Sequence, residues 1–199
     1  MGMFGALAAV LMLFEVPLPF LAPSFYGLDF AEVPMLVGTF ALGPVAGIVM
    51  QIVKILIKLI LKPTSTGFVG EFANVVMSCA LILPAGFIYR FKKSKNGALA
   101  GMAVGTVLMA VAGVVMNALV MIPFYSNFMP IETIIKAGAA VNPAVSSVWT
   151  LAIFCVGPFN LVKGTLTSVI TAVIYKRISV LIYGASHGTS GSYGVKKAV

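Results

Sequence analysis

Apolar residues follow one another in long runs along this chain, and each run ends at prolines, glycines or charged residues. The runs lack the every-second-residue alternation of a barrel strand, and most approach the roughly 20 residues that a helix needs to cross a bilayer. The pattern therefore predicts an all-α integral membrane protein with six transmembrane helices, over residues 3–16, 33–42, 44–61, 71–90, 97–122 and 147–177.

The division between the second and third helices depends on Gly43-Pro44. A single helix over 33–61 would leave five spans and would place the basic stretch "RFKKSK" opposite the basic C-terminus. Two helices place both basic clusters on one side and leave the first loop, which carries Asp29 and Glu32, on the other. Because basic residues concentrate on the cytoplasmic side of membrane proteins, we expect six spans with both termini in the cytoplasm.

Irregular backbone gathers in three connections on the predicted outer side, residues 17–32, 62–70 and 123–146, the longest of which has room for a short helix. Such backbone is tolerated near a membrane where it is buried in protein or lines a cavity, so a small-molecule pocket is expected beneath these loops. Residues 1–180 are expected to form one six-helix binding domain, and residues 181–199 a flexible cytoplasmic tail.

Composition agrees with a membrane location, since 60% of the 199 residues are hydrophobic and 9% are charged, against about 25% charged residues in soluble domains. The net charge of +8 comes from residues at helix ends, which favours an orientation signal over a nucleic-acid surface. Cys79 and Cys155 lie far apart in apolar segments and His187 lies in the tail, so the sequence predicts no metal site.

The stretch "GPFNLVKGTLTSVITAVIY" (157–175) carries polar residues inside an apolar helix. Asn160 and Lys163 are three residues apart and Thr167 lies one turn further, so the three side chains share one face. Lipid would reject such a face, which must point into the helix bundle. These groups either bind a hydroxyl-rich or amide-rich ligand or hydrogen-bond neighbouring helices near a kink expected at Gly157-Pro158.

Two further features of the outer half have both a structural and a functional reading. Asn117, in the fifth predicted span, either bonds a neighbouring helix or meets the same cavity as Asn160. Phe25, Tyr26 and Phe68 lie in loops at the outer end, where aromatic residues form a membrane-interface belt or stack on a flat ligand ring.

Lys54, Lys58 and Lys62 form a stripe with four-residue spacing toward the outer end of the third span. Long cationic side chains in such positions extend their ammonium groups to the membrane interface, which is the favoured interpretation over an anion-attracting role. Acidic residues that could pair with them are Asp29, Glu32 and Glu71.

Small residues recur at four-residue spacing in the first span, as Gly2 with Ala6 and Gly5 with Ala9. Faces of this kind let two helix backbones approach closely within lipid. The face is the best candidate in the sequence for contact with a partner protein.

Three stretches resemble the riboflavin-specific S component of energy-coupling-factor (ECF) vitamin transporters: "LDFAEVPMLVGTFALGPVAGIVMQIVK" (28–54), "GFVGEFANVV" (67–76) and "IPFYSN…PFNLVKG" (122–164). The resemblance extends over nearly the whole chain up to about residue 180. The first stretch is similar to S components generally, whereas Gly-Glu-Phe-Ala-Asn and Pro-Phe-Asn-x-x-Lys-Gly resemble the riboflavin branch more specifically.

The resemblance implies a six-helix fold that holds riboflavin near the outer face, beneath the first loop. It implies a membrane-embedded T subunit and two cytoplasmic ATPases as partners, with the Gly5 and Ala9 face docking the T subunit. Riboflavin would be the transported ligand, and no cofactor is implied. The residues that the resemblance assigns to substrate binding are Asn117, Asn160, Lys163, Leu28 and Asp29.

Other functions are weighed against this one. An S component for another vitamin or a nucleobase-like molecule would share the same fold. An intramembrane enzyme is disfavoured because the apolar segments contain no paired carboxylates, no histidine and no serine–base pair. A purely structural subunit would require a closed and empty cavity. The sequence has no Walker motif, so the energy for uptake must come from partner ATPases.

Overall fold

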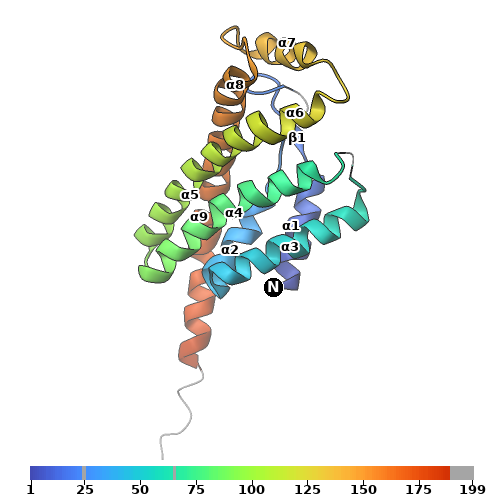
Figure 1. Cartoon of the computed structure of the whole chain (residues 1–199). Helices are drawn as coiled ribbons and strands as arrows, with labels where there is room; N and C mark the ends of the chain where they lie inside the picture. Colours follow the sequence, from blue (N-terminus) through green and yellow to red (C-terminus); the bar gives the residue numbers. More distant parts are fainter. Residues whose placement is uncertain (24–25, 65, 189–199) are drawn as a thin grey trace, which may run out of the picture.

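The computed structural model of the protein describes residues 1–23, 26–64 and 66–188, with side chains described up to Tyr175. Most of this part is helical (Figure 1). In chain order the elements are α1 (Gly2–Leu13), β1 (Val16–Pro17), β2 (Gly27–Leu28), α2 (Glu32–Leu42), α3 (Pro44–Leu61), α4 (Val69–Phe91), α5 (Lys95–Met116), the π-helical turn η1 (Asn117–Met121), α6 (Ile122–Tyr125), α7 (Ile131–Val141), α8 (Val148–Leu151), the π-helical turn η2 (Ala152–Val156) and α9 (Gly157–Gly188).

Gly43 separates α2 from α3, as the sequence predicts. Its φ of 97° lies in a region where glycine is strongly favoured, because a Cβ would be strained there. The Gly43 amide closes α2 by donating to the Thr39 carbonyl at 2.8 Å, and Pro44 begins α3. Proline suits the first helical position because its φ is already fixed near the helical value. The prediction of two helices in this segment is therefore confirmed.

Four helical stretches are long and apolar enough to cross a membrane: Pro44–Leu61, Val69–Phe91, Lys95–Tyr125 and Val148–Tyr175. The helices α1 and α2 are apolar but shorter. Every residue from Glu32 to Phe40 in α2 is buried, as expected for a helix that is surrounded by other helices. The predicted count of six spans thus stays a prediction, with four spans supported by length and composition.

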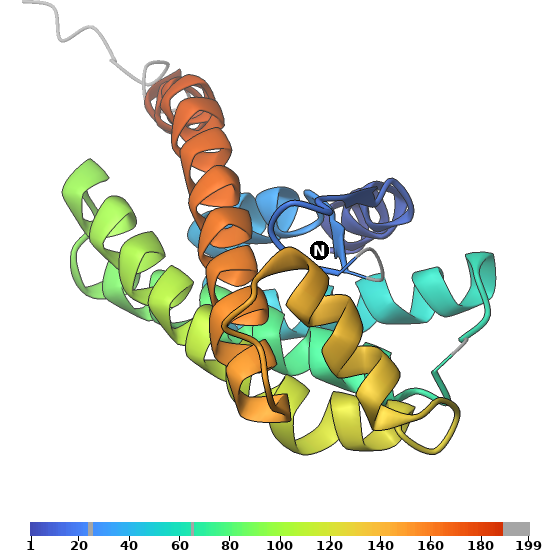
Figure 2. The same ribbon diagram turned by 90° about the horizontal axis from the view of Figure 1, so that it is seen from above.

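The two ends of the molecule differ (Figure 1). The β1–β2 hairpin, in which Val16 pairs with Leu28, lies at the top with α6, α7 and α8. The N-terminus of α1 and the end of α9 lie at the bottom. Seen from above, α9 lies against α5, whereas α1 lies on the other side beside α3 (Figure 2). The helix α7 occupies the long connection where a short helix was predicted.

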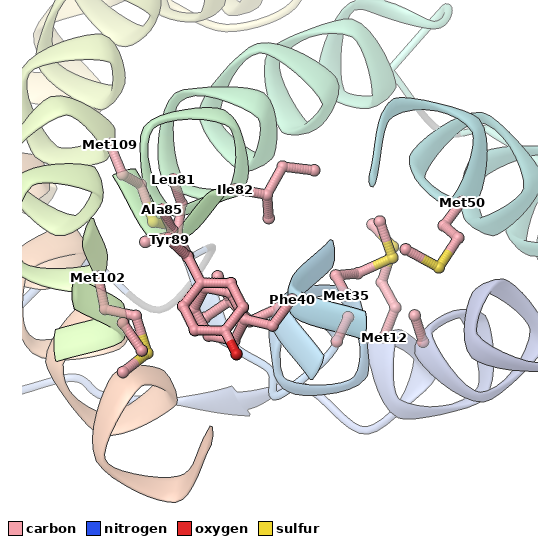
Figure 3. Packing of buried hydrophobic residues seen from close by; sticks show 14 of the residues in the cluster. Met12, Met35, Phe40, Met50, Leu81, Ile82, Ala85, Tyr89, Met102 and Met109 are labelled. Atoms are coloured by element: carbon pink, nitrogen blue, oxygen red, sulfur yellow. The ribbon is translucent and has the colours of Figure 1, made fainter. Parts of the chain in front are cut away.

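The interior contains a methionine-rich core, which α1 to α5 build around the buried helix α2 (Figure 3). The rings of Phe40 and Tyr89 lie 4.9 Å apart, and the hydroxyl groups of Tyr89 and Tyr175 are in hydrogen-bond contact. Unbranched methionine side chains fill the irregular gaps between such rings and helices. The methionines of this core are Met12, Met35, Met50, Met102 and Met109.

The small-residue face of α1 is used for packing inside the chain. A Cβ on Gly5 would lie 2.8 Å from Val53 Cγ1 and 3.2 Å from the Met50 carbonyl oxygen, so Gly5 allows α1 to approach α3 closely. Ala9 on the same face is completely buried. In this chain α3 thus covers Gly5 and Ala9 is buried, and docking of a T subunit through this face stays a prediction.

At the other end of the chain, α9 continues to Gly188. The predicted last span ends at residue 177 and the predicted tail begins at residue 181, so the helix is longer than the hydrophobic pattern indicates. The rest of the predicted tail, residues 189–199, lies outside the described residues.

Candidate functional site

A cavity of about 260 Å³ lies beneath the β1–β2 hairpin, among α3, α4, η1 and α9. Four of the five predicted site residues line it: Asp29, Asn117, Asn160 and Lys163. Its walls also contain the aromatic rings of Tyr26, Tyr125 and Phe159. The cavity therefore combines flat apolar surface with hydrogen-bonding and charged groups, as binding sites for small molecules commonly do.

Two residues that the sequence associated with this site, Leu28 and Thr167, do not line the cavity. Leu28, in β2, is buried among apolar residues beneath the outer loops and does not line the cavity. Thr167 is fully buried but also lies outside the lining. The shared face of α9 thus contributes Asn160 and Lys163 to the cavity, while Thr167 belongs to the helix packing below.

Asn117 is held at the cavity by contacts on both sides of its amide. Its Nδ2 donates to the Gly113 carbonyl at 2.8 Å, and its Oδ1 accepts a hydrogen bond from the Tyr26 hydroxyl at 2.6 Å. Burial raises the pKa of the Tyr26 phenol, so this hydroxyl keeps its proton at neutral pH. Tyr26, from the first loop, and Asn117, from η1, therefore join two distant segments at the cavity.

Asn160 is also held by its own helix and fits against a glycine on α5. Its Nδ2 donates to the Val156 carbonyl at 2.9 Å. A Cβ added to Gly113 would lie 2.5 Å from this Nδ2, so the absence of a side chain at residue 113 creates the space that Asn160 occupies. Of the three aromatic loop residues considered in the sequence, Tyr26 reaches the site and Phe68 is exposed; Phe25 lies outside the described residues.

Asn117 begins one π-helical turn and Asn160 follows another, and each turn comes shortly before a proline. In η1 the Ile122 amide bonds to the Asn117 carbonyl five residues earlier, directly before Pro123. In η2 the Gly157 amide bonds to the Ala152 carbonyl, directly before Pro158. Proline cannot donate a hydrogen bond and its ring crowds the carbonyl four residues back, so a wider turn relieves the conflict. The kink predicted at Gly157-Pro158 therefore takes the form of a π-turn, a feature common at functional sites.

Lys163 forms two buried ion pairs at the cavity. Its Nζ lies 2.7 Å from Asp29 Oδ2 and 3.4 Å from Glu32 Oε2. Asp29 is oriented by its own turn, because its Oδ1 accepts a hydrogen bond from the Ala31 amide at 2.9 Å. The cost of placing a lysine inside an apolar helix is thus offset by two carboxylates from the first loop and the start of α2.

Glu32 links this pair to a second buried lysine. Lys54 Nζ lies 3.4 Å from Glu32 Oε1 and donates to Asn74 Oδ1 at 2.9 Å. Ser78 also donates to Glu32 Oε1, at 2.8 Å. Two carboxylates and two ammonium groups are therefore connected away from water with balanced charge. Removing one partner of such a network leaves an uncompensated buried charge, at a cost of about 3–5 kcal/mol.

In the lysine stripe on α3, Lys54 departs from the predicted snorkelling, whereas Lys62 at the outer end is exposed as predicted. Lys54 has 0% exposed side-chain surface, so its ammonium pairs inside the bundle instead of reaching the interface. One turn further out, Lys58 pairs with Glu71, whose carboxylate also accepts hydrogen bonds from Thr64 and Thr66. Two of the acidic partners considered from the sequence, Glu32 and Glu71, are thus used by Lys54 and Lys58.

Sequence reasoning did not assign Glu32, Lys54 or Ser78 to the site. The available signal was the presence of several acids and lysines in otherwise apolar surroundings, where charges need partners. The partners themselves could not be chosen from spacing, because Lys163 and Asp29 are separated by 134 positions. The role of Asn74 as an acceptor for both Lys54 and Gln51 is likewise evident only in three dimensions.

Comparison with known proteins places this architecture in a defined class. Residues 1–175 match the sequence family described as "ECF transporter, substrate-specific component". The chain belongs to this family. It also shares the fold of a solved S component of a bacterial ECF transporter, with a TM-score of 0.70, 30% sequence identity and coverage of 90% of this chain and 93% of that one.

Individual relatives carry more specific names. The riboflavin transporter RibU of Staphylococcus aureus (strain TCH60) is 30% identical over 178 residues, which make up 89% of this chain and 87% of the relative. The riboflavin transporter FmnP of Bacillus subtilis (strain 168) is 28% identical over 180 residues, or 89% and 88% of the two chains. A riboflavin transporter RibU of Streptococcus thermophilus is 25% identical and covers 87% of this chain.

Proposed function

We propose that this chain is the riboflavin-binding S component of an ECF transporter and that the polar cavity is its vitamin site. It captures riboflavin from the outer side of the cell membrane, and the partner T subunit and two cytoplasmic ATPases drive uptake. The ligand contacts are Asn117, Asn160, Lys163 and Asp29. The chain itself performs no catalysis.

The observation that carries this proposal is the meeting of Asn117, Asn160 and the Asp29–Lys163 pair in one cavity beside aromatic rings. Riboflavin has a flat ring system with several acceptors and a ribityl chain with several hydroxyl groups. Amide and ammonium groups can satisfy those atoms, and aromatic walls can contact the ring. Hydrogen bonds inside a dry cavity are electrostatically stronger than in water.

Titration of the purified protein with riboflavin tests the proposal through quenching of flavin fluorescence. Saturable binding, with a flavin absorption band that follows the protein during purification, is the expected result. If another vitamin or a nucleobase displaces riboflavin and binds at lower concentrations than riboflavin does, the result would favour an S component of different specificity. A protein that binds none of these ligands would contradict the function.

The proposed orientation places both termini and residues 90–96 in the cytoplasm, with residues 17–32, 62–70 and 123–146 outside. It rests on the basic residues around the α4–α5 turn and near the C-terminus. In a variant with Cys79 and Cys155 replaced by alanine, a membrane-impermeant thiol reagent applied to intact cells should label Ser126→Cys and spare Ser94→Cys. The reverse pattern would overturn this orientation.

A further inference from the structure

The carboxylate of Glu32 lies between two buried lysines from different helices. Its Oε2 is 3.4 Å from Lys163 Nζ on α9, and its Oε1 is 3.4 Å from Lys54 Nζ on α3. Ser78, on α4, donates to the same Oε1. Glu32 is 1% exposed, so each of these contacts is made away from water.

The two carboxylates that contact Lys163 are supported in different ways. Asp29 lies in the loop between β2 and α2, and its second oxygen is used by the local turn. Glu32 belongs to α2, which is buried along most of its length, and its second oxygen is held by α3 and α4. Lys163 is thus held from the loop by one acid and from the helix bundle by the other.

We propose that Glu32 and Lys54 form a positioning pair that aims the Lys163 ammonium at the ligand; this rests on the proposed role of Lys163 in binding. An ammonium group has three hydrogens. Asp29 Oδ2 accepts one of them at 2.7 Å, and Glu32 Oε2 attracts the ammonium electrostatically from a second side at 3.4 Å, which leaves a hydrogen for an acceptor in the cavity. Lys54 balances the charge of Glu32 and holds its Oε1, so that Oε2 is the oxygen turned toward Lys163.

The network explains why a second lysine lies so deep in α3. Lys54 has 0% exposed side-chain surface, and Glu32 is its one ion-pair partner among the described residues. Its other contacts, Asn74 and Ser78, are neutral. Lys54 reaches the cavity lining through these three residues, and of the three Glu32 is the one paired with Lys163.

A charge-balanced variant tests the pair: Glu32→Met with Lys54→Met replaces both groups by apolar side chains of similar length. Riboflavin affinity, measured by fluorescence quenching, is expected to fall about tenfold or more, the range for a lost charged hydrogen bond. Gln51→Met is the matched control, because Gln51 is fully buried on the same helix and donates to Asn74 without contacting Glu32 or Lys163. It should bind riboflavin as the parent does. A folded double variant with parental affinity would overturn the proposal.

A second background separates positioning from general stability. In Asp29→Asn with Lys163→Met, the group that Glu32 aims is gone, so adding Glu32→Met and Lys54→Met should weaken binding no further. A further tenfold loss in that background would contradict the positioning role. Parental affinity of Asp29→Asn with Lys163→Met itself would instead contradict the proposed ligand site.

If the double variant does not fold, Glu32→Asp gives the same answer. It keeps the charge opposite Lys54 but is one methylene shorter, so it cannot keep both lysine contacts. Weaker riboflavin binding in a folded Glu32→Asp protein supports positioning, and unchanged binding contradicts it.

Discussion

The polar network around Lys163 and the methionine-rich core are both buried, yet they are built on opposite rules. In the network each charged group has a partner from a different segment at a defined distance, as with Lys54 and Glu32. In the core, flexible thioethers such as those of Met50 and Met109 fill space without directional bonds. Apolar side chains gain little hydrophobic free energy by moving from lipid into this core, because hydrocarbon tails are as apolar as the side chains themselves. Charge pairs therefore fix the positions of the helices near the site, whereas the side chains of the core adjust to the space between the helices.

Removing one charged partner from the polar network should cause the largest loss of stability. Lys54→Met leaves two acids facing Lys163 alone, and the uncompensated buried charge should destabilise the ligand-free protein by about 3–5 kcal/mol. Met50→Leu, one turn away on α3 and equally buried, is the matched control and should cost less than about 1.5 kcal/mol. Thermal unfolding in detergent compares them, and equal losses would remove the distinction between the two regions.

Removing the ligand-facing charge should weaken riboflavin binding in addition to the stability lost when the buried acids lose a partner. For Lys163→Met, riboflavin affinity should fall by about 1.5–3 kcal/mol, or about 10- to 150-fold, as for other hydrogen bonds to charged groups. Fluorescence quenching gives the affinity. Because Lys163→Met alone leaves Asp29 without its nearest partner, Asp29→Asn with Lys163→Met serves as the charge-balanced control. If Lys163 were only structural, affinity would survive and the loss would appear in thermal stability.

Next to the methionine-rich core, a larger side chain should lower stability where the backbones of α1 and α3 meet. Gly5→Leu places a side chain against Val53 and the Met50 carbonyl, and overpacking of this kind costs about 1–3 kcal/mol. Gly2→Leu, one turn earlier on α1 with nothing within 4 Å of the added Cβ, should leave thermal stability unchanged. A Gly5→Leu protein as stable as the parent would show that α1 does not depend on this close approach.

The smallest effect is expected where the two regions touch, at Gly113. Gly113→Ala brings a methyl group within 2.5 Å of Asn160 Nδ2 and should displace that amide. Loss of one neutral hydrogen bond to the ligand corresponds to about 0.5–1.5 kcal/mol of binding free energy. Gly157→Ala is the control, since its nearest contact would be an ordinary 3.4 Å. Equal riboflavin affinity of both variants would argue against a role for Asn160.

Much of the fold could be predicted from hydrophobic runs and their breaks. The division at Gly43 follows from the break in the hydrophobic pattern, and the shared face of Asn160 and Lys163 follows from helical periodicity. The sequence left open both the helix in the long connection and the position of Asn117 at the same cavity. What spacing cannot supply is the direction in which a helix face points. The stripe of lysines on α3 and the small residues of α1 were both interpreted as outward-facing, and Lys54 and Gly5 are in fact buried.

The site shows the same division between local and long-range information. The i, i+3 relation of Asn160 and Lys163 is local, so their shared face could be predicted. The pairing of Lys163 with Asp29 and Glu32 depends on how α2 packs beside α9, which is a property of the whole bundle. Leu28 lies beside Asp29 in sequence but packs under the outer loops, because successive residues of an extended segment point to opposite sides.

The two π-turns also bear on how chain length can vary in this family. A π-turn holds one more residue than the α-helical turn it replaces, so the helices on either side keep their rotational phase while the chain gains a position. Loss of one residue from η1 or η2 would return Pro123 or Pro158 to a regular α-helix, where the ring would meet the carbonyl four residues back. A one-residue deletion in 117–121 or 152–156 should therefore be accepted together with replacement of the following proline, and not alone. Relatives that are one residue shorter at either turn are expected to lack the proline that follows it. A relative that has the deletion and keeps the proline would refute this link between helix phase and proline position.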